Sequence, residues 1–308
     1  MPDWQLCKRK VDYMHKIKPI IIFTIHIILQ LANMSLWGGL IIIFGLLRFL
    51  LPIKVINQVL LKLMHRLYLS FGIISVAMIK IFNPIEIQID IDEPLSKQKW
   101  YLITVNHISY LDIILLIDFC APRIPPPKFF LKKELIWLPF VGLSAWALDM
   151  PFMRRYSKAF IDKHPHLKGK DIQATKKSCE KYINTPTTVI NFVEGTRFTK
   201  KKHKEKQSPF SHLLRPKAGG IAFTLNAMGE LFSNILDITL AYPDSSHPMM
   251  DMLSGKMTKI VIDVRTMDVS NELIGDYFEN KHFQTKFQIW INALWTAKNE
   301  KIRKWMTN

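Results

Sequence analysis

A histidine and an aspartate five residues apart are the side chains in this sequence that most suggest acid–base chemistry. His107 and Asp112 lie in segment 106–112 (NHISYLD), which directly follows the apolar run 100–105. A carboxylate at this spacing can accept a hydrogen bond from one imidazole nitrogen, which leaves the other nitrogen free to take a proton. The pair predicts a general base; the alternative is a surface histidine beside a helix-capping aspartate.

A second motif follows another apolar run, 187–192, and consists of Glu194, Gly195, Thr196 and Arg197. The glycine permits a tight turn and a close backbone approach to a ligand. The arginine offers a planar, permanently charged fork that suits phosphate, and the threonine adds a hydroxyl donor. Glu194 would hold the loop or bind an acceptor hydroxyl. The alternative is an ordinary turn with a solvated arginine.

A third feature is the adjacent pair Arg154 and Arg155, at the end of an apolar stretch in segment 149–155 (DMPFMRR). Two guanidinium groups at such a position suggest an anion site. A solvated basic pair is the alternative reading of the same dipeptide.

Short apolar runs precede the first two motifs and recur along the chain. They lie at 85–91, 100–105, 128–131, 187–192, 236–242 and 259–265. Helix-length segments separate them, and this alternation predicts an α/β fold with a mostly parallel central sheet flanked by helices. Ligands bind beyond the carboxyl ends of the strands in such sheets, where both motifs begin.

The N-terminal part of the chain has a different character. Residues 19–47 contain no Asp, Glu, Lys or Arg, and the run exceeds the roughly 20 residues that span a bilayer as a helix. Gly38 and Gly39 interrupt this run, so we expect either one tilted span or a bent helix that enters and returns. A second apolar helix is predicted over 53–82. Basic residues flank both sides of the first run, so orientation is not defined.

Two domains are therefore expected. Residues 1–82 form a membrane-anchoring helical region, and residues 83–308 form the α/β domain. An amphipathic helix over 283–306 ends the chain, either packed on the domain or in contact with a membrane.

The charge balance predicts an anionic partner, because 42 Lys and Arg against 25 Asp and Glu leave a net charge of +17. The cations flank apolar segments and no nucleic-acid-binding signature is present, which favours an anionic membrane over nucleic acid. Three cysteines far apart predict a reducing compartment. No metal-ligand spacing and no nucleotide-binding glycine pattern occurs, so neither metal nor cofactor is expected.

Together the motifs resemble, in order and spacing, those of the glycerolipid acyltransferase family that includes 1-acyl-glycerol-3-phosphate acyltransferases. The resemblance covers roughly residues 95–245. The family's NHxxxxD block is matched by Asn106, His107 and Asp112, and its EGTR block by residues 194–197. The basic residue of its second block looks like Arg154, or else Arg155. A Pro-Lys-x-Gly segment that often follows is similar to the sequence that begins at Pro216.

The resemblance implies a glycerol-3-phosphate acyltransferase-like fold and a membrane-bound O-acyltransferase. It would move a fatty acyl group from acyl-CoA or acyl-carrier protein to the free hydroxyl of lysophosphatidic acid, giving phosphatidic acid. His107 would act as general base with Asp112 orienting it, and Arg154 and Arg197 would bind the acceptor phosphate. Alternatives are another lysophospholipid or glycerol 3-phosphate as acceptor, or a non-catalytic membrane adaptor on this fold.

Two further expectations accompany this activity. The basic segment 200–206 (KKKHKEK) would grip lipid headgroups or the acidic face of a carrier protein, unless it is a solvated loop. Since acyl thioesters are cytosolic, the catalytic domain should face the cytoplasm. A bacterial inner membrane is favoured, with an internal eukaryotic membrane as the alternative.

Overall fold

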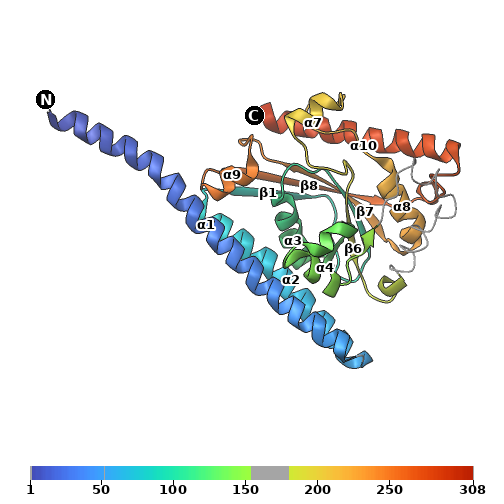
Figure 1. Cartoon of the computed structure of the whole chain (residues 1–308). Coiled ribbons are helices and arrows are strands. Elements are labelled where there is room, and N and C mark those ends of the chain that lie inside the picture. The colour runs from blue at the N-terminus through green and yellow to red at the C-terminus, as the bar shows by residue number, and fades with distance from the viewer. Residues whose placement is uncertain (1, 52, 154–179, 308) are drawn as a thin grey trace.

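The six strand-length runs form the central sheet of the molecule, in the computed structural model shown in Figure 1. The structure describes residues 2–51, 53–153 and 180–307. The strands of the sheet are β1 (Glu86–Ile91), β2 (Tyr101–Val105), β3 (Pro127–Phe129), β6 (Thr188–Phe192), β7 (Asn234–Ala241) and β8 (Lys259–Asp268). A separate two-stranded sheet pairs β4 (Leu131–Lys132) with β5 (Phe152–Met153).

The order of strands puts β2 inside the sheet. The order is β1-β8-β7-β2-β6-β3, and every neighbouring pair is parallel except β7 and β8. Val105, the last residue of β2, pairs with Phe192 of β6 on one side and with Ile238 of β7 on the other. The predicted α/β class with a mostly parallel sheet is thereby confirmed, and the segments after β2 and β6 begin side by side.

Helices cover both faces of the sheet, so the domain has three layers (Figure 1). One face packs against α2 (Lys54–Phe82), α3 (Leu111–Arg123), α4 (Val141–Ala147) and α9 (Pro248–Leu253). The other face packs against α8 (Ala218–Met228) and the C-terminal helix α10 (Lys281–Thr307). Alternate residues of β2 serve the two cores, with Ile103 in the first and Leu102 in the second.

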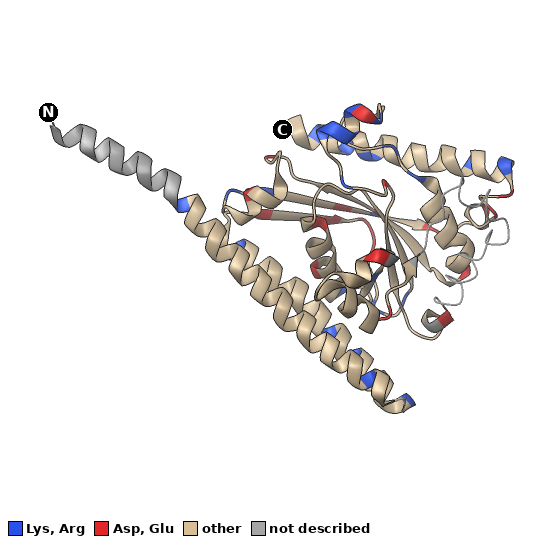
Figure 2. Cartoon of the chain, in the orientation of Figure 1, with Lys and Arg blue, Asp and Glu red and all other residues tan. Residues whose placement is uncertain are grey.

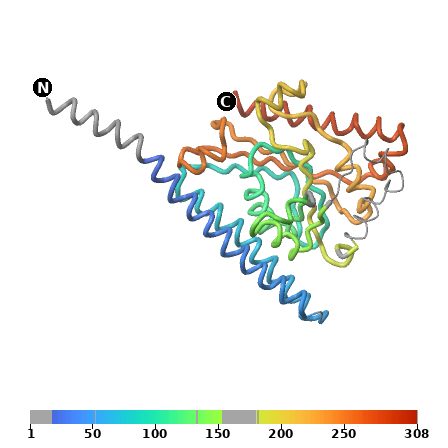
Figure 3. The backbone as a smooth tube through the Cα atoms, in the orientation of Figure 1, coloured from blue at the N-terminus to red at the C-terminus, as the bar shows by residue number. Residues whose placement is uncertain are grey.

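Two long helices form a hairpin along one side of the body (Figures 1 and 3). Helix α1 (Pro2–Leu50) runs without a break through Gly38 and Gly39, so of the two expected alternatives the helix that bends at these glycines is wrong. Gly38 instead allows a close approach to α4, because a Cβ there would lie 3.0 Å from Cβ of Phe140. Its carbonyl oxygen accepts a hydrogen bond of 3.2 Å from Ser144 Oγ. The chain turns back between α1 and α2, beyond Leu50.

Polar side chains join the two helices of the hairpin. Asn33 Nδ2 donates to Ser75 Oγ at 2.9 Å and to the carbonyl oxygen of Phe71 at 3.1 Å. Gln30 Nε2 donates to the carbonyl oxygen of Ser75 at 3.1 Å. Hydrogen bonds between helices define their register in apolar surroundings, where unspecific hydrophobic contact does not.

The outer surface of the hairpin is apolar. Lys18–Leu50 and Lys54–Phe82 are both long and apolar enough to cross a membrane, by length and composition. Figure 2 shows most of the ribbon of the two helices in tan, with the cations Lys62, Arg66 and Lys80 on α2 as exceptions. Trp137, Leu138 and Trp146 extend the apolar surface onto and around α4, with side chains exposed as well. An exposed apolar surface of this extent marks a site of membrane or protein contact.

We expect Gly72→Ala to destabilise the packing of α2 on α3. A Cβ at Gly72 would lie 2.5 Å from Cγ2 of Ile117, so a neighbour must shift, whereas a Cβ at Gly39 would meet no atom within 4 Å. Overpacking costs about 1–3 kcal/mol, while Gly→Ala in an open helix position stabilises by about 0.5–1 kcal/mol. Thermal unfolding in detergent should therefore rank Gly72→Ala below the wild type and Gly39→Ala at or above it. Equal melting temperatures for the two variants would contradict this contact between α2 and α3.

Candidate active site

The structure brings His107 and Asp112 together at the end of β2. Helix α3 begins at Leu111, so Asp112 lies in its first turn and its side chain turns back toward the strand end. The distance from His107 Nδ1 to Asp112 Oδ2 is 2.8 Å. The aspartate side chain is fully buried, whereas 12% of the histidine side chain is exposed. The histidine is thus the member of the pair that solvent or a ligand can reach.

Asp112 accepts hydrogen bonds from several donors, which decides the tautomer of the histidine. The backbone N–H groups of Ile108 and Ser109 donate to Oδ2 at 2.7 and 2.9 Å, and the hydroxyl of Tyr242 donates to Oδ1 at 2.5 Å. Since the carboxylate acts as acceptor throughout, the neutral imidazole of His107 donates from Nδ1 and carries its lone pair on Nε2. In the described residues Nε2 has no hydrogen-bond partner, so it is placed to take a proton.

The end of β7 fixes the position of residues 106–110, the loop between β2 and α3 that is called the histidine loop below. The side chain of Asn106 is fully buried and makes two bonds of 2.9 Å to the backbone of Leu240, donating to its carbonyl oxygen and accepting from its N–H. Tyr242 follows β7 directly and reaches Asp112. Sequence reasoning missed Tyr242, although the residue ends a predicted strand and is an aromatic group with a polar tip.

The loop after β6 lies directly against the histidine loop. The N–H of Phe198 donates to the carbonyl oxygen of His107 at 2.7 Å. Gly195 has a φ of +66°, and a Cβ there would lie 3.2 Å from Cδ of Lys217, so the turn requires glycine in this backbone conformation. Residues 194–197 and the His107–Asp112 pair therefore form one site.

Arg197 is held beside the histidine loop by an aromatic ring. Its guanidinium carbon lies 3.6 Å from the centroid of Tyr110, whose side chain is largely exposed. This is a cation–π contact, and it keeps the charge at the rim of the site. Thr196 Oγ1 accepts a hydrogen bond of 2.7 Å from Lys202 Nζ, which also reaches the carbonyl oxygen of Arg197 at 3.2 Å. Tyr110 lies within the first motif, but sequence reasoning assigned it no role.

One face of the imidazole is covered by an apolar wall. The rings of His107 and Phe192 stack with centroids 4.1 Å apart and an angle of 25° between their planes. Phe129 continues the stack, with its centroid 6.1 Å from that of Phe192. These rings cover one side of the imidazole and exclude water from it. Arg154, the other predicted site residue, lies outside the described residues.

Glu194 is buried beneath the site rather than exposed in it. Its side chain is 1% exposed, and neither carboxylate oxygen has a hydrogen-bond partner among the described residues. Burial raises the pKa of Glu194 to about 8, the negative charge of Asp112 adds to this effect, and the positive charge of Lys298 opposes it. The group is therefore mainly protonated at neutral pH.

The comparisons with known proteins agree on one family. The acyltransferase family model matches residues 86–242. Human 1-acyl-sn-glycerol-3-phosphate acyltransferase delta is 27% identical over 153 residues, which cover 47% of this chain and 38% of that protein. The Saccharomyces cerevisiae 2-acyl-1-lysophosphatidylinositol acyltransferase is 24% identical over 238 residues, covering 63% of this chain and 58% of that protein. The chain thus spans less than two thirds of either relative.

A solved structure has a similar fold. The crystal structure of the 1-acyl-sn-glycerophosphate (LPA) acyltransferase PlsC from Thermotoga maritima matches with a TM-score of 0.57 at 15% identity. The match covers 94% of this chain and 98% of that chain. The expected fold type is confirmed, including the apolar helices that precede the sheet.

The buried acid predicts a pH-dependent difference in stability. A pKa of about 8 in the folded protein lies above the ordinary value of 4.5, so Glu194 contributes stability that is fully present below about 4.5 and is lost as the pH rises through 8. Glu194→Gln cannot titrate. Its melting temperature should therefore rise relative to the wild type between pH 5 and 8.5, by the equivalent of at least about 2 kcal/mol.

The control for this comparison is Glu230→Gln, at an exposed carboxylate in the short helix η4 (Gly229–Leu231). Its melting temperature should follow the wild type at every pH. A difference between Glu194→Gln and the wild type that stays constant over the same range would show that Glu194 is already ionised in the fold.

Proposed function

Because this chain belongs to the acyltransferase family, we propose that it transfers a fatty acyl group from an acyl thioester to the free hydroxyl of a lysophospholipid. Lysophosphatidic acid is the proposed acceptor and phosphatidic acid the product. The observation that carries the proposal is that His107, whose tautomer is set by Asp112, lies in contact with the loop that carries Arg197. His107 would act as the base for a hydroxyl group, and Arg197 would bind a phosphate close to it.

In the proposed mechanism His107 acts as the general base. Its Nε2 takes the proton of the acceptor hydroxyl while the oxygen attacks the carbonyl carbon of the thioester. The carbon–sulfur bond then breaks, and the thiolate leaves with the proton from Nε2. Asp112 keeps Nδ1 protonated and stabilises the imidazolium that forms between the two steps. No covalent intermediate on the enzyme is needed.

The second motif is proposed to bind the acceptor. Arg197 would pair with the phosphate, and Gly195 and Thr196 would bring backbone and hydroxyl groups close to it. Arg154 is proposed as a second cation for the same phosphate. Glu194 would support this loop from beneath, since it is buried. A larger headgroup remains the second candidate, because one relative that matches 63% of the chain is named for lysophosphatidylinositol.

The donor and the membrane belong to the same proposal. Acyl-CoA or acyl-carrier protein would approach from the cytoplasm, with residues 1–82 as the membrane anchor and 83–308 as the catalytic domain. The apolar outer surface of the hairpin supports this arrangement. An ion pair of 2.8 Å between Arg48, at the end of α1, and Asp149 ties the hairpin to the catalytic domain. A bacterial inner membrane is the proposed location.

The basic segment after the second motif forms helix α7 (Lys200–Glu205) rather than an extended loop. Lys200, Lys201 and Lys204 are exposed on it, whereas Lys202 bonds to the loop of Thr196. We propose that these exposed lysines attract the anionic groups of a lipid headgroup or of an acidic donor to the site.

The test of this function is transfer of labelled acyl groups by the detergent-solubilised protein. Lysophosphatidic acid, glycerol 3-phosphate, lysophosphatidylinositol and lysophosphatidylcholine are offered with acyl-CoA, and then with acyl-carrier protein. Formation of phosphatidic acid supports the proposal, and transfer to another acceptor replaces the substrate. No transfer from either donor to any acceptor would contradict it.

In the same assay Arg197→Ala should raise the KM for lysophosphatidic acid at least about tenfold, because a charge-assisted bond to phosphate is lost. The KM for the donor should change little. The matched control is Arg123→Ala, which removes another arginine stacked on a ring, 5.0 Å from the centroid of Phe119, at the end of α3. Equal increases in both KM values for Arg197→Ala would argue against phosphate binding.

Tyr242→Phe should lower kcat by roughly tenfold, because it removes one of the donors that hold Asp112 behind the base. The KM values should stay within about twofold of the wild type. Tyr68→Phe is the matched control, since the hydroxyl of Tyr68 is also buried but has no hydrogen-bond partner in the part of the chain that the structure describes. A kcat for Tyr242→Phe equal to that of Tyr68→Phe would show that this hydrogen bond does not support the base.

A further inference from the structure

Lys298 occupies a core position of the C-terminal helix. The side of α10 that packs on the sheet carries Phe287, Ile291, Trp295 and Ile302, all nearly inaccessible to solvent. Lys298 lies in the same stripe, three residues after Trp295 and four before Ile302, and is 1% exposed. The spacing of the apolar residues calls for another apolar side chain there. In the sequence this lysine looks like one of several cations in the last turns of an amphipathic helix.

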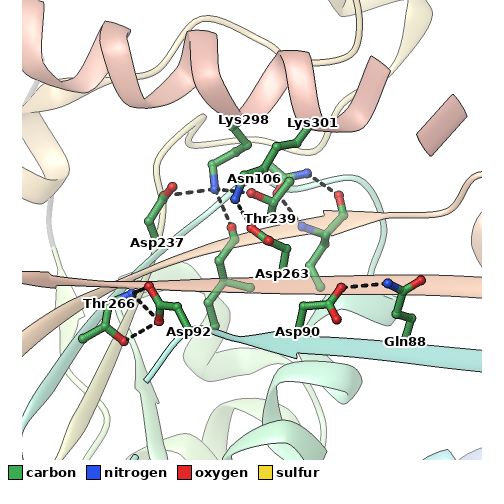
Figure 4. Close-up of polar contacts among 12 residues, drawn as sticks. Gln88, Asp90, Asp92, Asn106, Asp237, Thr239, Asp263, Thr266, Lys298 and Lys301 are labelled. Atoms are coloured by element: carbon green, nitrogen blue, oxygen red, sulfur yellow. Dashed lines mark hydrogen bonds and ion pairs between the residues drawn. The ribbon is translucent and has the colours of Figure 1, made fainter. Parts of the chain in front are cut away.

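The ammonium group of Lys298 reaches β7. Nζ donates to the carbonyl oxygen of Ile238 at 2.6 Å, lies 3.0 Å from Oδ1 of Asp237 and reaches Oγ1 of Thr239 at 3.2 Å. These partners match the three protons of an ammonium group. Figure 4 shows Lys298 pointing from α10 toward Asp237 and Thr239, with Asn106 beside them.

A buried ion pair is a costly way to hold a helix on a sheet. Taking both charges out of water costs several kcal/mol per ion, and well-packed apolar residues of similar volume are often as stable or more so. Stability alone therefore does not account for a lysine at this position. What the pair does provide is a defined position for the backbone and side chains that it bonds.

The residues held by Lys298 adjoin those that hold the catalytic pair. Thr239 directly precedes Leu240, whose backbone bonds the side chain of Asn106. Two residues further on, Tyr242 donates to Asp112. On the neighbouring strand, Thr104 Oγ1 donates to Oδ1 of Asp237 at 2.8 Å. Lys298 thus bonds to β7 next to the residues that hold Asn106, at the start of the histidine loop, and Asp112, just after its end.

We propose that Lys298 is a positioning residue of the active site, which acts from the C-terminal helix through β7, Asn106 and Tyr242 on the His107–Asp112 pair. The inference rests on the proposed function. It also gives the C-terminal segment a part in catalysis, although the family match ends at residue 242. Lys298 touches neither reacting atom.

The environment of Glu194 agrees with this role. Lys298, on α10, lies near the buried acid of the second motif and its positive charge favours the charged form of Glu194, against the larger effect of burial on the pKa of Glu194. The same stretch of helix therefore lies behind both motifs of the site.

Lys301 provides a matched control on the same helix. It lies three residues after Lys298 and forms an ion pair with Asp263, but on β8, which does not carry the catalytic loop. Figure 4 shows the two lysines next to each other on α10. Lys298→Met and Lys301→Met each remove the lysine of an ion pair with an aspartate of the sheet. The pair of Lys301 is partly exposed and that of Lys298 is buried, so the cost of leaving Asp237 unpaired is tested separately by the double variant described below.

Two measurements on the full-length variants test the proposal. The first is steady-state acyl transfer, in which Lys298→Met should lose roughly tenfold or more in kcat with both KM values within about twofold of the wild type. The second needs no substrate. Diethyl pyrocarbonate modifies unprotonated imidazole nitrogens, and mass spectrometry should show His107 reacting severalfold more slowly in Lys298→Met. Lys301→Met should match the wild type in both.

Equal kcat values and equal modification rates for the two variants would overturn the proposal, as would a loss confined to KM. Should Lys298→Met fail to fold, the double variant Asp237→Asn/Lys298→Met leaves no unpaired buried charge and should show the same loss of kcat. A wild-type kcat in the double variant would also overturn it. Failure of the proposed function is distinct: the wild type would then transfer no acyl group, while the modification rates would still test the effect of Lys298 on His107.

Discussion

The carboxylate of Asp112 is the point on which the arrangement of the site depends. It accepts from the imidazole of His107, from two backbone N–H groups and from the hydroxyl of Tyr242. These donors come from the end of β2, from the turn before α3 and from the segment after β7, so the carboxylate has all its partners only when these three segments are packed together. A buried carboxylate without donors is very unfavourable, so the fold as well as the proposed chemistry requires this packing.

The order of strands in the sheet explains why the imidazole of His107 lies close to the loop that carries Arg197. Since β2 and β6 are parallel neighbours, the segments that follow them leave the sheet at the same edge, and the N–H of Phe198 bonds directly to the carbonyl oxygen of His107. The two faces of the sheet then serve different purposes. One face of the sheet packs on the side of the apolar hairpin that we propose as the membrane anchor. The other face packs against α10, whose Lys298 forms hydrogen bonds to β7.

Much of this architecture is readable from local sequence patterns, and the remainder depends on strand order. Alternation and length were sufficient to predict the six strands of the sheet, and the spacing of His107 and Asp112 predicted their contact, because both features act over a few residues. Tyr242 and Lys298 escaped prediction, since each acts across strands, and a tyrosine or lysine has the same local pattern whether it is buried or solvated. The choice between a straight and a bent helix at Gly38 was left open for a related reason: this glycine packs against the residues at the start of α4, which local sequence does not reveal.

The most direct test of the account is the rate of acyl transfer to lysophosphatidic acid by His107→Ala, with His282→Ala, at an exposed histidine of α10, as control. Both variants are compared with the wild type at saturating donor and acceptor, after their melting temperatures have been shown to agree. The account predicts a loss of about 10²-fold or more for His107→Ala and a wild-type rate for His282→Ala. A wild-type rate for His107→Ala would remove the histidine from the mechanism and contradict the account.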